Sequence, residues 1–132
     1  MLEVYVDGAT SGNPGPSGIG IVLKKKNFLK EEKHSIGIVN NHEAELIAVT
    51  KGLQLCKELF PGEILSLRSD SKLVIDMIEK EYTKNKTFAP YLEQILSLMH
   101  TFPYCFIKWI PDGQNTQADR LARLAIQAIN ES

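Results

Sequence analysis

The chain has 132 residues, of which 43% are hydrophobic and 23% are charged. This length suits a single domain over residues 1–132, and the composition is typical of a globular protein that buries a core. The net charge of −1 and the pI near 6.3 exclude a bulk electrostatic binder of nucleic acid, so any such binding must depend on local charge or on metal ions.

Other classes of protein are excluded by the distribution of apolar residues. No apolar run is long enough to cross a bilayer, and the first residues lack the basic and then apolar order of a secretory signal. We therefore expect a cytoplasmic monomer without a membrane partner. Cys56 and Cys105 lie in apolar segments without neighbouring His or Cys, which predicts buried free thiols rather than a disulfide or a zinc site.

The first third of the chain is typical of strands joined by short connections. Leu2 to Asp7 is apolar and β-prone and predicts a strand, whereas Gly8 to Gly18 is dense in Gly, Pro, Ser and Asn and predicts a loop. The segment 28–33 is ambiguous. Two further strands, and the polar hairpin between them, are predicted at Ser17–Leu23, His34–Val39 and Lys24–Asn27. Such short connections favour antiparallel neighbours.

A helical period begins after these strands. Apolar residues recur at helical spacing from Asn41 to Phe60, with Asn40 or Asn41 as the N-cap and Glu43 completing a loose capping box with Asn40. The remaining predicted elements are strands at Glu63–Ser69 and Tyr104–Ile110 and helices at Ser71–Glu79, Phe88–Thr101 and Thr116–Ile129. This order predicts one mixed α/β sheet with helices packed on its faces.

Four acidic residues stand at or near the ends of these elements. Asp7 and Asp70 end predicted strands, Glu45 lies beside the apolar stripe of the first helix, and Asp119 lies near the start of the last helix. Strand ends of open α/β sheets are where such folds build sites, and carboxylates gathered there repel each other unless cations neutralise them. Oxygen ligands without Cys or His favour Mg²⁺ or Mn²⁺ over zinc. Two such ions, about 4 Å apart, activate water in phosphodiester cleavage.

Each of these acids, taken alone, also has a purely structural interpretation. Asp7 before Gly8 suits an Asx turn, and Asp70 suits a helix N-cap. Asp119 complements a helix dipole, and Glu45 suits a helix residue that either extends its carboxylate to the solvent or forms a salt bridge. The four together, in this order, favour a shared site.

Four segments resemble the four motifs of type 1 ribonucleases H, in that family's order and spacing and over nearly the whole chain. The segments are Val4–Pro16, Asn40–Leu46, Arg68–Val74, and Trp109–Pro111 followed by Asn115–Ala122. Each contains one of the four acids. Four co-linear motifs are far more specific than one.

This resemblance implies a ribonuclease H-like fold: a five-stranded mixed sheet whose first three strands are antiparallel, with helices on both faces. It implies an endoribonuclease that hydrolyses the RNA strand of RNA–DNA hybrids with two Mg²⁺ ions, or Mn²⁺, and leaves 5′-phosphate ends. By analogy, Asp7 would bridge both ions, and Asp119 would share the ion that activates water. Glu45 and Asp70 would share the ion on the leaving-group side, with Glu45 near the RNA 2′-hydroxyl.

The resemblance also implies a set of substrate contacts, which are Gly8, Asn13, Asn40, Asn41, His42 and Asn115. Asn41 matches a family Asn that reaches the minor groove, Asn40 replaces a Thr that helps to hold a DNA phosphate, and His42 replaces a second Asn or Gln. Capping of a turn or helix is an alternative role for the asparagines. Trp109 suits either a base-stacking platform or a core position, and its place at a strand end favours the core.

Two departures from the family pattern lower the expected activity. The loop Pro111–Asn115 lacks the His that many type 1 enzymes carry there, and Lys80–Lys86 stands where some members have a long basic protrusion with Trp. We therefore expect weaker hybrid binding, low activity and a preference for Mn²⁺. The alternative function is a catalytically weak or inactive nucleic-acid-binding module on the same fold. Another nuclease or a strand-transfer enzyme is a third possibility.

Overall fold

Three long strands form the first part of the sheet in the computed structural model, which describes residues 1–131. The strands β1 (Leu2–Thr10), β2 (Gly15–Lys25) and β3 (Phe28–Val39) follow one another through short turns and pair antiparallel. The ambiguous segment 28–33 is therefore strand, because it pairs with β2 over its whole length.

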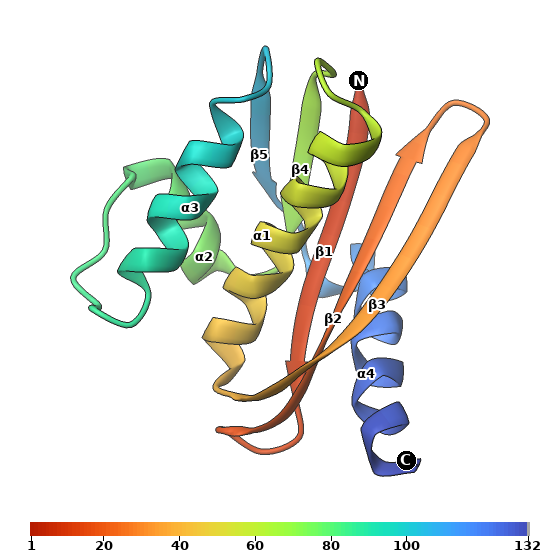
Figure 1. Cartoon of the computed structure of the whole chain (residues 1–132), viewed down its shortest axis with the longest axis vertical. Coiled ribbons are helices and arrows are strands. Elements are labelled where there is room, and N and C mark those ends of the chain that lie inside the picture. Colours follow the sequence, from red (N-terminus) through yellow and green to blue (C-terminus); the bar gives the residue numbers. More distant parts are fainter. Residues whose placement is uncertain (132) are drawn as a thin grey trace.

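Two short parallel strands complete the sheet on the other side of β1. They are β4 (Leu65–Ser69) and β5 (Cys105–Trp109), and the strand order is β3-β2-β1-β4-β5. The helices are α1 (Asn41–Leu59), α2 (Lys72–Lys80), α3 (Ala89–Met99) and α4 (Thr116–Glu131), with a short 3₁₀ turn at Asp112–Gln114. The expected five-stranded mixed sheet with helices on both faces is confirmed (Figure 1).

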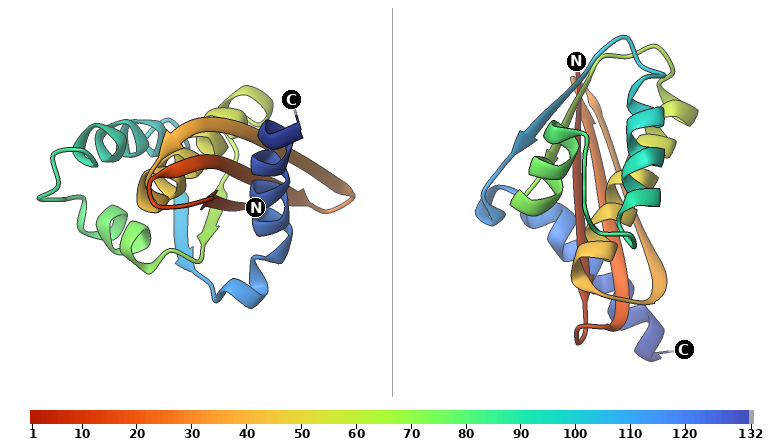
Figure 2. Two further views of the ribbon diagram at one scale, coloured as in Figure 1. Left: turned by 90° about the horizontal axis from the view of Figure 1, so that it is seen from below. Right: turned by 90° about the vertical axis from the view of Figure 1, so that its left-hand side faces the viewer.

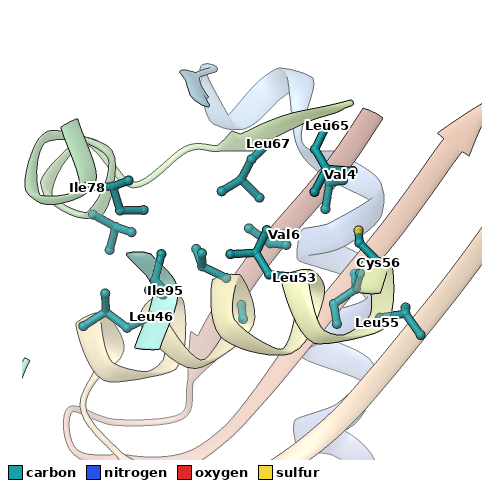
Figure 3. Close-up of a cluster of buried hydrophobic side chains, with 14 of the residues drawn as sticks. Val4, Val6, Leu46, Leu53, Leu55, Cys56, Leu65, Leu67, Ile78 and Ile95 are labelled. Carbon is teal, nitrogen blue, oxygen red and sulfur yellow. The ribbon is translucent and has the colours of Figure 1, made fainter. Parts of the chain in front are cut away.

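The larger core lies between the sheet and helices α1, α2 and α3. Val4 and Val6 of β1 point into it and meet Leu53 of α1, Leu67 of β4 and Ile95 of α3 (Figure 3). Side chains alternate along a strand, so the residues between them face the opposite side. There α4 covers β1 to β3 over a smaller cluster of Val22, Ala118 and Leu121. Figure 2 shows α1 and α3 on one side of the sheet and the start of α4 on the other.

Helix α1 forms where its apolar period predicts, and its first turn is capped by Asn40. The side-chain oxygen of Asn40 accepts from the backbone N–H of Glu43, and its amide donates to Glu43 Oε1, at 2.8 and 2.9 Å. The predicted capping box is therefore confirmed, with Asn40 rather than Asn41 as the cap.

The glycine-rich segment predicted as one loop is mostly strand. Strand β1 continues to Thr10 and β2 begins at Gly15, so only residues 11–14 form the turn. Pairing of Gly8 with Ile19 and of Thr10 with Ser17 explains the difference, because cross-strand partners far apart in sequence override a local turn composition.

Cys56 is buried and Cys105 is half-buried, and both are free thiols. No helix within the described residues is long and apolar enough to cross a membrane.

Candidate active site

The four acids lie near the point where the parallel pairing of β1 with β4 ends, which is inside β1 rather than at its predicted end at Asp7, because β1 continues to Thr10. These strands are parallel neighbours, with Tyr5 opposite Arg68, so Asp7 and Asp70 follow two residues later at the same edge. Asp7 is 8% exposed, although it is a carboxylate. Glu45 is brought in by α1 from one face and Asp119 by the first turn of α4 from the other. The arrangement follows the rule that open α/β sheets build sites at strand ends.

Two glycines set how closely these helices approach Asp7. A Cβ on Gly8 would lie 2.4 Å from the backbone carbon of Ala44, so α1 rests directly on the β1 backbone. A Cβ on Gly20, the cross-strand partner of Asp7, would lie 2.1 Å from the carbonyl oxygen of Ala118. Because Glu45 follows Ala44 and Asp119 follows Ala118, these contacts place both acids beside Asp7.

Burial and crowding make Asp7 the most perturbed acid of the set. Burial raises the pKa of Asp7 from its ordinary value of 3.8 to about 9, and the neighbouring carboxyls of Asp70 and Asp119 add to the rise. Glu45 contributes a smaller effect in the same direction. A carboxyl with this environment keeps its proton at neutral pH unless a cation compensates its charge.

Glu45 and Asp70 have raised pKa values as well, and each has a polar partner. Burial raises the pKa of Glu45, whereas hydrogen bonding to Ser71 and the nearby His42 oppose the rise. Burial also raises the pKa of Asp70, and the side chain of Asn115, which donates to Asp70 Oδ2 at 3.3 Å, lowers it. Both carboxyls are therefore oriented before any ligand arrives.

Asp119 is half-buried and forms an ion pair. Nε of Arg123, one helical turn later, donates to both carboxylate oxygens of Asp119 at 3.0 and 3.1 Å. The dipole role proposed for Asp119 is compatible with its place in the first turn of α4.

The donor set fits a hard divalent cation. The four acids are carboxylates with no thiol among them, and Asp70, Asp119 and Glu45 are close enough to Asp7 to add to the rise that burial causes in its pKa. Among the described residues, no three His, Cys, Asp or Glu side chains converge closely enough to form a ready-made metal site. The ligands would therefore have to shift from their present partners when an ion binds.

The predicted substrate contacts at the start of α1 are engaged in local hydrogen bonds. Asn13 Oδ1 accepts from the backbone N–H of Asn41 at 3.0 Å, which ties the β1–β2 turn to α1. Asn41 Oδ1 accepts from the N–H of His42 at 3.0 Å, and Asn40 is the helix cap. The capping alternative is thus realised for Asn13 and Asn40.

His42 lies between Glu45 and the start of α3. Its Nδ1 is 3.3 Å from Glu45 Oε1 and makes no hydrogen bond in the described part of the chain, while its ring meets Phe88 edge-on. Gly8 serves the helix packing described above. Whether Gly8, Asn13, Asn40, Asn41, His42 and Asn115 contact a substrate stays a prediction.

Asn115 does not use its side chain to cap α4. Its amide donates to the carbonyl of Val6 and to Asp70, and it is 1% exposed. Its Oδ1 has no partner among the described residues. Asn115 therefore fixes Asp70 relative to β1.

Three roles differ from the sequence interpretation or were missed by it. The N-cap of α2 is Ser71, not Asp70, because Ser71 Oγ accepts from the N–H of Val74.

The expectation of a core position for Trp109 is wrong. Trp109 lies at the end of the edge strand β5, is 46% exposed and donates from Nε1 to the carbonyl of Asp70. Gly20 was missed, although a glycine inside a strand pattern signals close backbone approach.

The chain is similar to several known proteins. A family model described as reverse transcriptase-like matches residues 5–125. The putative hydrolase EbsB of Enterococcus faecalis is 44% identical over 129 residues, which cover 96% of this chain and 95% of that protein. The mycobacterial bifunctional protein Rv2228c is 33% identical over 135 residues, and this chain spans only 37% of its length.

Two solved structures superpose on nearly the whole chain. The N-terminal RNase H domain of Rv2228c from Mycobacterium tuberculosis has a TM-score of 0.91 and 30% identity, with 98% of this chain and 96% of that chain covered. LC11-RNase H1, solved in complex with an RNA/DNA hybrid, has a TM-score of 0.91 and 28% identity, with coverages of 98% and 99%. The matching sequence model, these relatives and the solved structures lead to one conclusion: the chain belongs to the ribonuclease H family.

Proposed function

We propose that this chain is a metal-dependent endoribonuclease that hydrolyses the RNA strand of RNA–DNA hybrids and leaves 5′-phosphate and 3′-hydroxyl ends. The observation that carries the proposal is the buried Asp7 with three other carboxyls as neighbours: burial first, and then these neighbours, raise its pKa to about 9. Such a carboxylate set suits metal-assisted hydrolysis, in which a metal-activated water is the nucleophile. Support also comes from LC11-RNase H1, which was solved with an RNA/DNA hybrid.

Each acid has a distinct proposed role. Asp7 interacts with each of the other three acids, so it would hold both ions, one shared with Asp119 and the other with Glu45 and Asp70. Two divalent ions, Mg²⁺ or Mn²⁺, would neutralise these carboxylates and supply Lewis-acid activation of water and of the leaving oxygen. Asn115, which donates to Asp70, would orient that carboxylate, and Ser71, which lowers the pKa of Glu45, would favour the charged form of the other.

Recognition of the hybrid would take place beside Glu45. Asn41 and His42 stand one turn before Glu45 on α1, so a strand whose 2′-hydroxyl reaches Glu45 would pass both side chains. The 2′-hydroxyl distinguishes RNA from DNA, which gives this surface its proposed selectivity. A cytoplasmic location and a monomeric state stay predictions, which cell fractionation and size-exclusion chromatography would test.

The direct test is cleavage of end-labelled RNA–DNA hybrid, RNA duplex and DNA duplex with Mg²⁺, with Mn²⁺ and with a chelator. We expect cleavage of the RNA strand of the hybrid alone, and only with a divalent ion. Equal cleavage of the DNA duplex, or full activity in chelator, would refute the proposal.

The second candidate is a binding module with negligible turnover. The short segment Lys80–Lys86 and the loop Pro111–Asn115, which has no His, favour it. Replacing Lys80–Lys86 by a basic segment that contains Trp should tighten hybrid binding and raise activity at low substrate concentration. Tighter binding without cleavage in either metal would favour the binding module over the enzyme.

A further inference from the structure

Asp119 differs from the other three acids because an arginine forms an ion pair with it. Asn115, Ser71 and His42 are the polar neighbours of Asp70 and Glu45, whereas Asp119 is held by the guanidinium of Arg123 at 3.0 Å. A guanidinium keeps its charge at every relevant pH, so Arg123 resembles a cation already placed at the proposed metal ligand. The Arg123 side chain is 74% exposed, which leaves it free to move elsewhere.

A pocket beside this ion pair is suited to receive an anion. It measures about 600 Å³ and is lined by residues from the end of β1, the start of α1 and α4. Its polar lining consists of Thr10, Ser11, Asn41, Gln127 and Arg123, and Arg123 is the charged residue among the described residues that line it. Hydroxyl, amide and guanidinium donors together suit a phosphate group of a nucleic-acid strand.

We infer that Arg123 is an exchangeable counter-ion: it holds Asp119 while no divalent ion is bound, and it turns to a substrate phosphate in this pocket when an ion takes Asp119. The inference rests on the proposed function and extends it. A divalent ion at Asp119 repels the guanidinium and competes for the same two oxygens. The exposed pair between residues four apart on one helix is weak, so exchange is feasible. The substrate strand would then leave the acids toward Thr10 and Ser11.

The first test measures metal binding without nucleic acid. The melting temperature is followed during titration with Mn²⁺ for the wild-type protein, Arg123→Ala, Arg123→Lys and Arg120→Ala. Arg120 is the matched control, because it lies on the same helix and pairs with Glu31 instead. We expect Arg123→Ala to bind Mn²⁺ several-fold more tightly than wild type, with Arg120→Ala unchanged and Arg123→Lys in between.

The possible outcomes separate the inference from the proposed function. Equal or weaker Mn²⁺ binding by Arg123→Ala overturns the counter-ion role, while the metal site itself stands. A stronger effect in Arg120→Ala than in Arg123→Ala also overturns it, because general charge would then be the cause. No Mn²⁺-dependent shift in any variant overturns the proposed metal site together with the exchange.

The second test measures the phosphate contact. Binding to a hybrid whose RNA strand is 2′-O-methylated is measured against salt concentration, with Mn²⁺ and with chelator. With Mn²⁺, Arg123→Ala should reduce the slope of log K against log salt by about one, since one phosphate contact is lost. With chelator, where Asp119 retains Arg123, the reduction should be smaller. An equal reduction in both conditions, or the same reduction in Arg120→Ala, overturns the exchange.

Discussion

The four acids and the polar residues around the start of α1, here called the rim (Asn13, Asn40, Asn41 and His42), differ in how they affect the stability of the fold. Asp7, Glu45 and Asp70 all have raised pKa values, so the metal-free fold holds them in an unfavourable environment. In the rim, Asn13 and Asn40 instead make well-formed hydrogen bonds to the backbone of α1.

The difference separates residues that cost stability from residues that supply it. Ionisable groups with strongly shifted pKa values are typical of functional sites. A helix cap with all its hydrogen bonds formed needs no role beyond stabilising the helix. The acids are thus the stronger functional candidates. The rim carries a structural role whether or not it also contacts a substrate.

The largest expected effect is that of Asp7→Asn on activity. Loss of the acid between the others should lower hybrid cleavage roughly 10³-fold or more, because several kcal/mol of metal-dependent stabilisation would be lost. The same change should raise the melting temperature in chelator, since it removes a crowded carboxyl. Asp76→Asn, on α2 and outside the site, is the control for both measurements. A lower melting temperature in chelator would show that Asp7 stabilises the fold, as the capping asparagines do, rather than costing stability.

The second largest effect is expected for a substitution at Gly20, where α4 approaches β2 closely. Gly20→Ala would place a Cβ 2.1 Å from the Ala118 carbonyl oxygen, and overpacking of this kind costs about 1–3 kcal/mol or more. Activity should fall as well, because the displaced helix turn carries Asp119. Gly113→Ala is the matched control, since a Cβ there meets nothing within 4 Å. Urea unfolding and hybrid cleavage measure the two effects, and equal stability of both variants would contradict the packing argument.

The metal-free protein should lose stability as pH rises. The pKa of Asp7 is about 9 in the folded state and near 3.8 when unfolded, so between these values the folded state binds the extra proton. The favourable contribution of this proton to folding stability is fully present below the unfolded-state pKa of 3.8. It is lost as the pH rises through the folded-state pKa of about 9. Melting temperatures in chelator, compared at about pH 5.5 and pH 8.5, check this. Asp7→Asn should flatten the profile, and an unchanged slope would place the titrating group elsewhere.

The smallest effect is expected in the rim. Asn40→Ala should destabilise the fold by about 1 kcal/mol through loss of the α1 cap, and Asn40→Ser should recover most of that loss. Chemical denaturation gives the stability, and cleavage per folded molecule gives the activity. An activity loss in Asn40→Ser without a stability loss would show that Asn40 also serves the substrate.

Much of this protein could be predicted from local sequence. The apolar period from Leu46 to Cys56 predicts α1 because a helix depends on contacts three and four residues apart, and the cap at Asn40 is equally local. The order of the four acids at the ends of successive elements predicts where they meet. The parallel pairing of β1 and β4 then brings Asp7 and Asp70 to one edge.

The tertiary structure decided what depends on partners distant in sequence. Gly8 to Thr10 became strand because β2 pairs with it, and Trp109 became exposed because β5 is an edge strand. Asn115 turned from a possible cap of α4 to a donor to Val6 and Asp70, 109 and 45 residues away. Sequence alone determined which carboxylates are the candidates for the proposed site. Only the packing of α1 and α4 on Gly8 and Gly20 determined how close those carboxylates lie, because a separation between elements is set by the side chains at their contact.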